Sequence, residues 1–273
     1  MPSGISQRGL NRPWENHGMQ DNPSDRTRPS RQQRAHGVSL DGVHELAAAV
    51  EAVREHPGPV ELPVGPDQLA GRHLGALPRR QMGEALREAG ADPLLVRATV
   101  SLDDDIPDEG VIAVLDDHLS LAAGLGARFL VVPRAGVDNR GRSEERVYSM
   151  LAALAEAASA HGVHLLLETE GATEDELDLL GALERAREEG VLDVDDRYVA
   201  SVAWNVGGST GAGEDLAAAF QRMRPLLDRA PLVLRGLDEA TLEALFAAVP
   251  DLEEAAAQRR VLVLLDGPGP AAG

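Results

Sequence analysis

A glutamate closes one short apolar segment of the sequence, within the stretch His161–Gly171 (HGVHLLLETEG). The segment 163–168 follows an Ala-rich helical pattern and carries three consecutive leucines before Glu168, which predicts a strand buried on both faces. Ligand sites of parallel α/β folds lie at the carboxyl ends of strands, so Glu168 is the first candidate for chemistry. As a general base it could remove a proton next to a carbonyl group.

Polar side chains also lie in or after the other predicted strands. Three of them are arginines, and guanidinium groups from separate strands predict binding of an anion such as a carboxylate or phosphate. Arg235 could also stabilise a developing enolate oxygen, and Asn205 suits a substrate hydroxyl. An equally open alternative is that each arginine neutralises a neighbouring carboxylate, and strand alternation leaves open whether Arg97 faces the helix layer instead. The candidate residues are Glu61, Arg97, Arg134, Glu168, Asn205, Arg235 and Asp266.

Histidines contribute one further candidate. His73 lies in a Gly/Pro-rich loop after the second predicted strand, on the side where the strands end, and could reach a substrate. His161 and His164 flank the start of their strand and are expected at the opposite end of the fold. His118 is expected on the exposed face of its helix, and the segment 207–211 (GGSTG) is expected to be a loop that could wrap a phosphate or act as a lid.

The elements that must position these residues alternate along the chain. Eight strand–helix units within about 235 residues predict a single (β/α)8 TIM barrel, with a doubly wound open sheet as the alternative. Alternation along the sixth strand directs Trp204 toward the helix layer. The predicted strands are 37–40, 60–64, 94–102, 128–132, 163–168, 198–206, 232–237 and 261–265, and the predicted helices are 41–56, 77–88, 110–125, 143–160, 173–189, 213–228 and 239–248.

Composition excludes several kinds of chemistry. Cys is absent, which rules out disulfides and Cys nucleophiles. All 26 basic residues are Arg, and Ala and Gly are abundant; this composition is typical of a GC-rich, bacterial-like genome. Without Lys the chain can form no Schiff base, hold no pyridoxal phosphate (PLP) and build no P-loop. No GxGxxG follows the first strand, so NAD is not expected either.

Charge and patterning set expectations for partners and location. The net charge of −19 argues against nucleic acid and anionic membranes. The sequence has no apolar run of membrane-spanning length and no signal-peptide pattern, so a cytoplasmic protein is expected. Residues 1–35 are polar, rich in Pro, Gly and Ser, and carry six Arg against three acidic residues. They are expected to be a disordered tail, and residues 36–273 a single barrel domain.

Three segments carry a resemblance to a known family. The succession LAAGLGARFLVVPRAG (121–136), LAALAEAASAHGVHLLLETEG (151–171) and VAWNVGG (202–208) resembles the xylose isomerase-like TIM barrels of the sugar phosphate isomerase/epimerase superfamily. The likeness covers about residues 36–267. It implies isomerisation or epimerisation of a small sugar-like or hydroxy-acid substrate by proton transfer, and a possible homodimer.

The resemblance also implies a site for one divalent metal, Mn, Mg, Co or Zn, held by Glu, Asp, His and Glu on the fifth to eighth strands. Glu168 matches the first ligand, Asn205 stands in place of the Asp, and Asp266 could replace the last Glu. Arg235 stands where the His is expected, and an arginine neither ligates a cation nor tolerates one nearby at low cost. The sequence therefore favours a site without metal over one with metal. The alternative function is a metal-free barrel that binds an anionic metabolite or a protein partner.

Overall fold

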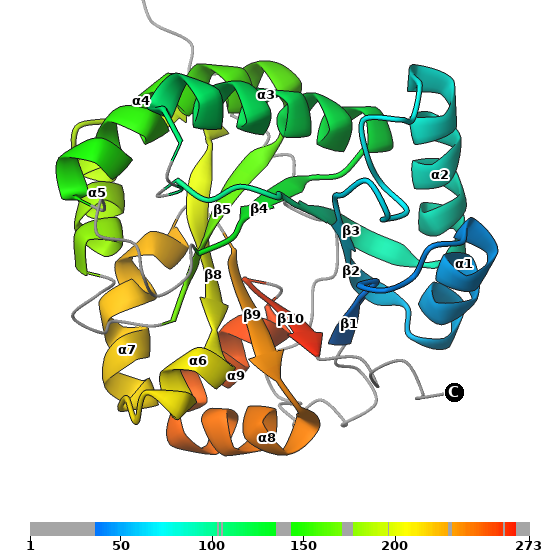
Figure 1. The fold of residues 1–273 in the computed structure, drawn as a ribbon. Helices are drawn as coiled ribbons and strands as arrows, with labels where there is room; N and C mark the ends of the chain where they lie inside the picture. The colour runs from blue at the N-terminus through cyan, green and yellow to red at the C-terminus, as the bar shows by residue number, and fades with distance from the viewer. Residues whose placement is uncertain are drawn as a thin grey trace, which may run out of the picture. The chain divides into compact units, whose positions relative to one another are not determined.

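A closed barrel of parallel strands forms the centre of the fold, and helices surround it (Figure 1). The computed structural model describes residues 36–102, 104, 106–134, 143–170, 177–195, 197–228, 231–258 and 260–265. The strands neighbour one another in the order β1-β10-β9-β8-β5-β4-β3-β2, which confirms the predicted (β/α)8 barrel rather than the open sheet. The expected tail at 1–35 lies outside the described residues, as does Asp266.

The barrel strands are short and almost wholly apolar, as expected for strands covered on both faces. Every neighbouring pair is parallel, including the pair that closes the ring between the first strand and the last. The strands are β1 (His36–Ser39), β2 (Gly58–Pro63), β3 (Ala91–Arg97), β4 (Phe129–Val132), β5 (His164–Thr169), β8 (Ala200–Asn205), β9 (Leu232–Leu237) and β10 (Val261–Leu265).

Several of the helices that follow these strands are capped at one end. Ser143 accepts a hydrogen bond from the Arg146 amide at 3.3 Å, and Gly126 ends its helix in the left-handed conformation with φ of 69°. The helices are α1 (Leu46–Glu55), α2 (Ala76–Ala89), α3 (Asp108–Leu125), α4 (Glu144–His161), α5 (Leu177–Glu188), α6 (Val206–Gly211), α7 (Leu216–Met223), η3 (Arg224–Asp228), α8 (Glu239–Ala248) and α9 (Pro250–Ala257).

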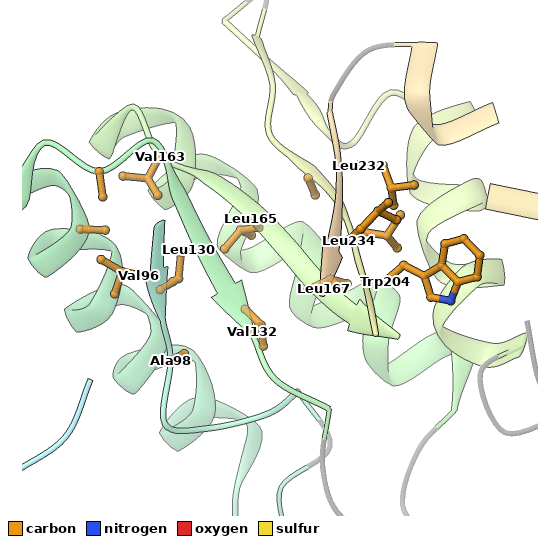
Figure 2. Packing of buried hydrophobic residues seen from close by; sticks show 14 of the residues in the cluster. Val96, Ala98, Leu130, Val132, Val163, Leu165, Leu167, Trp204, Leu232 and Leu234 are labelled. Atoms are coloured by element: carbon orange, nitrogen blue, oxygen red, sulfur yellow. The ribbon is translucent and has the colours of Figure 1, made fainter. Parts of the chain in front are cut away.

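Alternation along each strand divides the buried residues into two clusters. One faces the helices and includes Trp204, which confirms its predicted orientation (Figure 2). The indole N–H of Trp204 donates to Ser209 Oγ at 2.7 Å. The other fills the barrel interior below the carboxyl ends of the strands. Its members are Leu95, Phe129, Val131, Leu166, Ala203, Val233 and Leu264.

Three local predictions are wrong. Residues 207–211, expected as a loop, lie in helix α6, because the Asn205 side chain caps the turn and glycine permits close packing: a Cβ at Gly207 would lie 2.3 Å from the Gly236 carbonyl oxygen. The third strand ends at Arg97 rather than at residue 102. His118 is buried, not exposed, because its spacing from Leu115, Leu119 and Ala122 places it on the inner face of α3.

The sequence prediction also missed three small elements. They are helix α9 and the antiparallel pair β6 (Asp193–Val194) and β7 (Arg197–Tyr198), which precedes β8. Within the described ranges, no helix combines the length and the apolarity that crossing a membrane requires.

Candidate functional site

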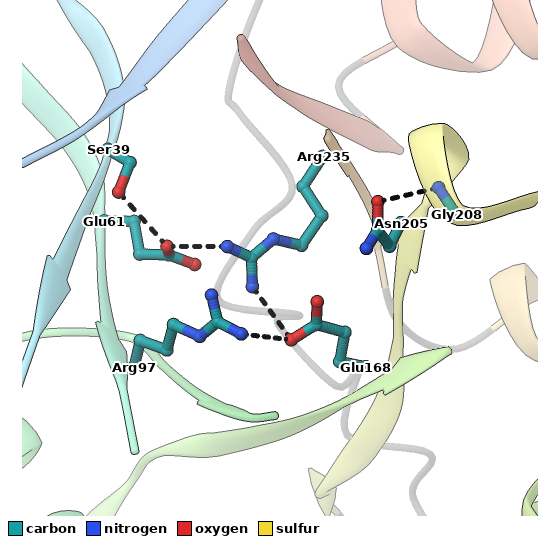
Figure 3. A network of polar contacts seen from close by, with 7 residues as sticks. All are labelled: Ser39, Glu61, Arg97, Glu168, Asn205, Gly208 and Arg235. Atoms are coloured by element: carbon teal, nitrogen blue, oxygen red, sulfur yellow. Dashed lines mark hydrogen bonds and ion pairs between the residues drawn. The ribbon is translucent and has the colours of Figure 1, made fainter. Parts of the chain in front are cut away.

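Four charged side chains from four strands meet at the carboxyl-terminal mouth of the barrel (Figure 3). Arg235, from β9, donates from Nη2 to Glu61 Oε1 on β2 at 3.0 Å and from Nη1 to Glu168 Oε2 on β5 at 3.1 Å. Arg97, from β3, donates from Nη2 to the same Glu168 oxygen at 2.7 Å. We refer to Glu61, Arg97, Glu168 and Arg235 as the mouth network.

Strand alternation explains why these side chains converge. Successive residues on a strand point to opposite faces, so a residue two positions after an interior apolar residue also faces the interior. Arg97 follows Leu95 by two positions, and the same spacing links Leu166 to Glu168 and Val233 to Arg235. The apolar interior cluster is thus the floor of the site, and Arg97 faces the interior rather than the helix layer.

Because the network is largely buried, its charged groups must be paired with one another. The Glu61 and Glu168 side chains are 1% and 7% exposed, Arg235 is 12% exposed and Arg97 is 30% exposed. Two guanidinium groups therefore face two carboxylates in a largely dry setting. A buried ion pair stabilises only when its members are well paired, whereas an unpaired buried charge costs several kcal/mol. Arg97 is the member of the network that solvent or a ligand reaches most readily.

Glu61 has the most perturbed environment of the four residues. Burial raises the pKa of its carboxyl group, although Arg235 and Arg97 both act to lower that pKa. The negative charge of Glu168 raises the pKa further, and a hydrogen bond from Ser39 Oγ at 3.4 Å lowers it. The second oxygen, Oε2, is buried and has no hydrogen-bond partner among the described residues. Burial thus favours the protonated form of the Glu61 carboxyl group.

The other predicted site residues lie outside this network. Arg134, after β4, pairs with Glu170 at 2.5 Å. Asn205 accepts a hydrogen bond from the Gly208 amide at 3.2 Å and so caps α6. His73 is exposed and folds over Gly71, and no described contact connects it to the network.

The pairing pattern agrees with the alternative in which each arginine neutralises a carboxylate. Arg97, Arg134 and Arg235 all contact a glutamate. Sequence reasoning missed Ser39, which contacts Glu61; its position at the end of the first strand was the signal available. It also did not include Glu170, whose side chain pairs with Arg134.

The described residues do not fit a divalent metal. They contain no group of three or more His, Asp or Glu side chains arranged to hold one. Of the two predicted ligands they include, Glu168 already accepts hydrogen bonds from two guanidinium groups, and Asn205 Oδ1 caps α6. A dication about 4 Å from Arg235 would be repelled by roughly 8 kcal/mol at an effective dielectric constant of about 20.

The histidine at the opposite end of the barrel has a structural environment. His164, at the start of β5, packs edge-on against Phe129 with ring centroids 5.8 Å apart and lies 6.2 Å from the Tyr198 ring. Burial lowers its pKa to about 4, and the two backbone hydrogen bonds at Tyr198 and Ala200 only partly oppose that effect. The position of His164 at the start of β5 confirms that it lies at the opposite end of the strand from Glu168.

Solved structures of the same fold resemble this chain along most of its length. A xylose isomerase domain containing protein from Salmonella typhimurium matches with a TM-score of 0.59 and 16% identity, over 85% of this chain and 88% of its own. A 3-keto-D-glucoside 4-epimerase from E. coli matches with a TM-score of 0.58 and 16% identity, over 88% and 94% of the two chains. A sugar phosphate isomerase/epimerase from Parabacteroides distasonis matches with a TM-score of 0.56 and 11% identity, over 87% of each.

No protein-family model and no curated protein matches the sequence significantly. At these identities the structural matches establish architecture and not activity. The closed parallel barrel and these matches show that the chain has a xylose isomerase-like TIM-barrel fold.

Proposed function

We propose that the protein is a sugar isomerase/epimerase-like enzyme that moves a proton on a small polar substrate, sugar-like or a hydroxy acid, at the carboxyl-terminal mouth of its barrel. The observation that carries the proposal is the contact between Glu168 and Arg235, a carboxylate and a guanidinium 3.1 Å apart and almost wholly buried. The names of the structural neighbours, among them a 3-keto-D-glucoside 4-epimerase, support the same reaction class.

The roles follow from the chemistry of the two groups. Glu168 acts as the base that removes a proton from the carbon next to a carbonyl group. Arg235 donates to the carbonyl oxygen and stabilises the negative charge that develops on it. Because both groups meet at one point, a substrate that places its oxygen near Arg235 brings the neighbouring carbon near Glu168. The floor of buried apolar residues excludes water from below and strengthens both interactions.

The remaining candidates provide binding rather than proton transfer. Arg97, as the most exposed member of the network, is suited to an anionic group of the substrate, and Arg134 to a second. Asn205, at the end of β8, would contact a substrate hydroxyl through its amide NH2 group. Glu61 fixes Arg235, and His73 contributes only if its exposed loop meets the substrate.

Proton exchange tests this proposal without knowledge of the natural substrate. The protein is incubated in D2O with a panel of aldoses, ketoses, their phosphates and 2-hydroxy acids, and loss of the C–H signal next to the carbonyl or carboxyl carbon is followed by proton NMR. We expect exchange with at least one compound class, reduced by about 10²–10⁴-fold in Glu168→Gln. Glu84→Gln, on the exposed face of α2, is the matched control and keeps wild-type exchange. Exchange that survives in Glu168→Gln would remove Glu168 from the mechanism.

A second candidate function is binding without catalysis, and one observation favours it. Both carboxylates of the network already pair with arginine, so neither is free to act as a base. This alternative predicts a thermal shift with phosphate or a di- or tricarboxylate that is lost in Arg97→Gln, together with no proton exchange in wild-type protein.

A further inference from the structure

Glu61 and Glu168 lie on different walls of the barrel mouth and share one cation. The first belongs to β2 and the second to β5, with β3 and β4 between them in the ring. The guanidinium of Arg235 reaches in from β9 and contacts one oxygen of each carboxylate, at 3.0 and 3.1 Å (Figure 3). A single positive group thus bridges two buried acids.

This bridge is the arrangement that a divalent cation would otherwise provide. Two nearly buried carboxylates repel each other and require a positive charge between them. Carboxylate oxygens are also preferred ligands of Mn2+, Co2+ and Mg2+. A metal and the Arg235 guanidinium would need the same carboxylate oxygens and would repel each other, so they cannot share this position.

We propose that Arg235 is the resident cation of the site, so that the native chain takes no divalent metal between Glu61 and Glu168, and that replacing Arg235 with a neutral ligand opens a metal site there. Glu61 becomes a ligand in this arrangement, a role that the fifth- to eighth-strand pattern does not include. The proposal concerns the same mouth as the proposed function but does not depend on catalysis, because its test measures bound metal rather than turnover.

The geometry around the pair supports this inference. The Arg97 guanidinium donates to Glu168 and not to Glu61 among the described residues, and it uses the Glu168 oxygen that Arg235 also contacts. Removing Arg235 therefore leaves Glu61 Oε1 without its guanidinium partner, next to the already unpaired Oε2. Glu168 keeps one cation. The freed Glu61 carboxylate and the space left by the arginine side chain are what an incoming cation would use.

The test compares Co2+ binding by wild type, Arg235→His and Arg235→His/Glu61→Gln, with titration calorimetry and the visible spectrum of bound Co2+ as readouts. Imidazole with two carboxylates is a good ligand set for Co2+. We expect Arg235→His to bind about one equivalent at least ~10-fold more tightly than wild type, because a repelling charge is replaced by a ligand. The double variant should lose this gain. Arg128→His, which removes an exposed arginine that pairs with Asp92 at 3.7 Å, is the matched control and should behave as wild type.

Three results would overturn the proposal: near-stoichiometric Co2+ in the wild-type protein that Glu168→Gln removes, a folded Arg235→His that binds no better than Arg128→His, or a gain in binding that persists in the double variant. If Arg235→His folds only with Co2+, the proposal is supported. If it does not fold at all, Arg235→Gln replaces it: a gain of Co2+ binding over wild type supports the proposal and no gain overturns it. None of these results depends on proton exchange, so the failure of this inference is distinct from the failure of the proposed function.

Discussion

Replacing Arg235 with methionine keeps an unbranched apolar stem and removes the charge, so it measures what the mouth network contributes to stability. At an effective dielectric constant of about 20, each of the two contacts near 3 Å represents a gross attraction of about 5 kcal/mol. Most of that attraction only offsets the desolvation of the charged groups. Breaking a buried pair by removing one partner costs about 3–5 kcal/mol, and we expect a loss of unfolding free energy in that range at pH 8.

The same variant should lose less stability at lower pH. Burial already raises the pKa of Glu61 in the folded protein, and removing its main positive neighbour raises that pKa further. A carboxyl group whose folded pKa lies above its unfolded value destabilises the protein at high pH, and this penalty disappears as the pH falls and the folded protein takes up the proton. The deficit of Arg235→Met relative to wild type should therefore shrink between pH 8 and pH 5.

Urea unfolding followed by circular dichroism at both pH values measures these losses. Arg128→Met, which breaks an ion pair whose side chains are 67% and 63% exposed, is the control and should cost less than about 1 kcal/mol. Glu61→Gln combined with Arg235→Met should recover part of the deficit, because no carboxylate is then left unpaired on β2. A deficit at pH 8 no larger than that of Arg128→Met, or one that grows at pH 5, would refute this account of the network.

Two further predictions concern the scaffold. Because burial lowers the pKa of His164 to about 4, the unfolded chain takes up the proton first as the pH falls below 6.5. Up to about 3 kcal/mol of unfolding free energy should therefore be lost by pH 4. In urea titrations His164→Gln should lose less stability over that range, and a loss equal to that of the wild type would contradict the assignment. In α2, a Cβ at Gly83 would lie 1.8 Å from the Leu125 carbonyl oxygen of α3, so Gly83→Ala should lower the unfolding free energy by about 2 kcal/mol or more. Gly110→Ala, whose nearest new contact is the Ile106 side chain at 3.9 Å, should be neutral or stabilising, and equal effects of the two substitutions would argue against this packing.

The regular elements were predictable wherever the local pattern was complete. Strands β9 and β10 and helix α8 have the predicted bounds, since each is an uninterrupted apolar or amphipathic segment with clear breaks on either side. The third strand was predicted to extend too far, to residue 102 instead of Arg97. Ala98 and Leu102 are apolar and buried although they follow the last paired residue, so their sequence pattern is the same as that of a buried strand. Helix α6 was missed because Gly-rich composition predicts a loop, whereas capping by Asn205 and the close approach of β9 stabilise a helix.

The site was predictable in its members but not in its pairing. Strand-end position identified Glu61, Arg97, Glu168 and Arg235 individually, because position along a strand is a local property. Which arginine meets which glutamate depends on the ring order of the strands and on their register, and these bring residues 174 positions apart into contact. The burial of His118 had the same origin, since one face of α3 is covered by the rest of the barrel.

The sequence by itself determined the class of fold, the absence of lysine and cysteine chemistry, and the set of charged groups at the strand ends, because composition and periodicity are properties of the chain alone. Only the tertiary structure decided that Arg235 bridges Glu61 and Glu168, and that Asn205 caps a helix. The physical reason is that barrel closure sets the distances between residues far apart in sequence, and burial then fixes the strength of their charges.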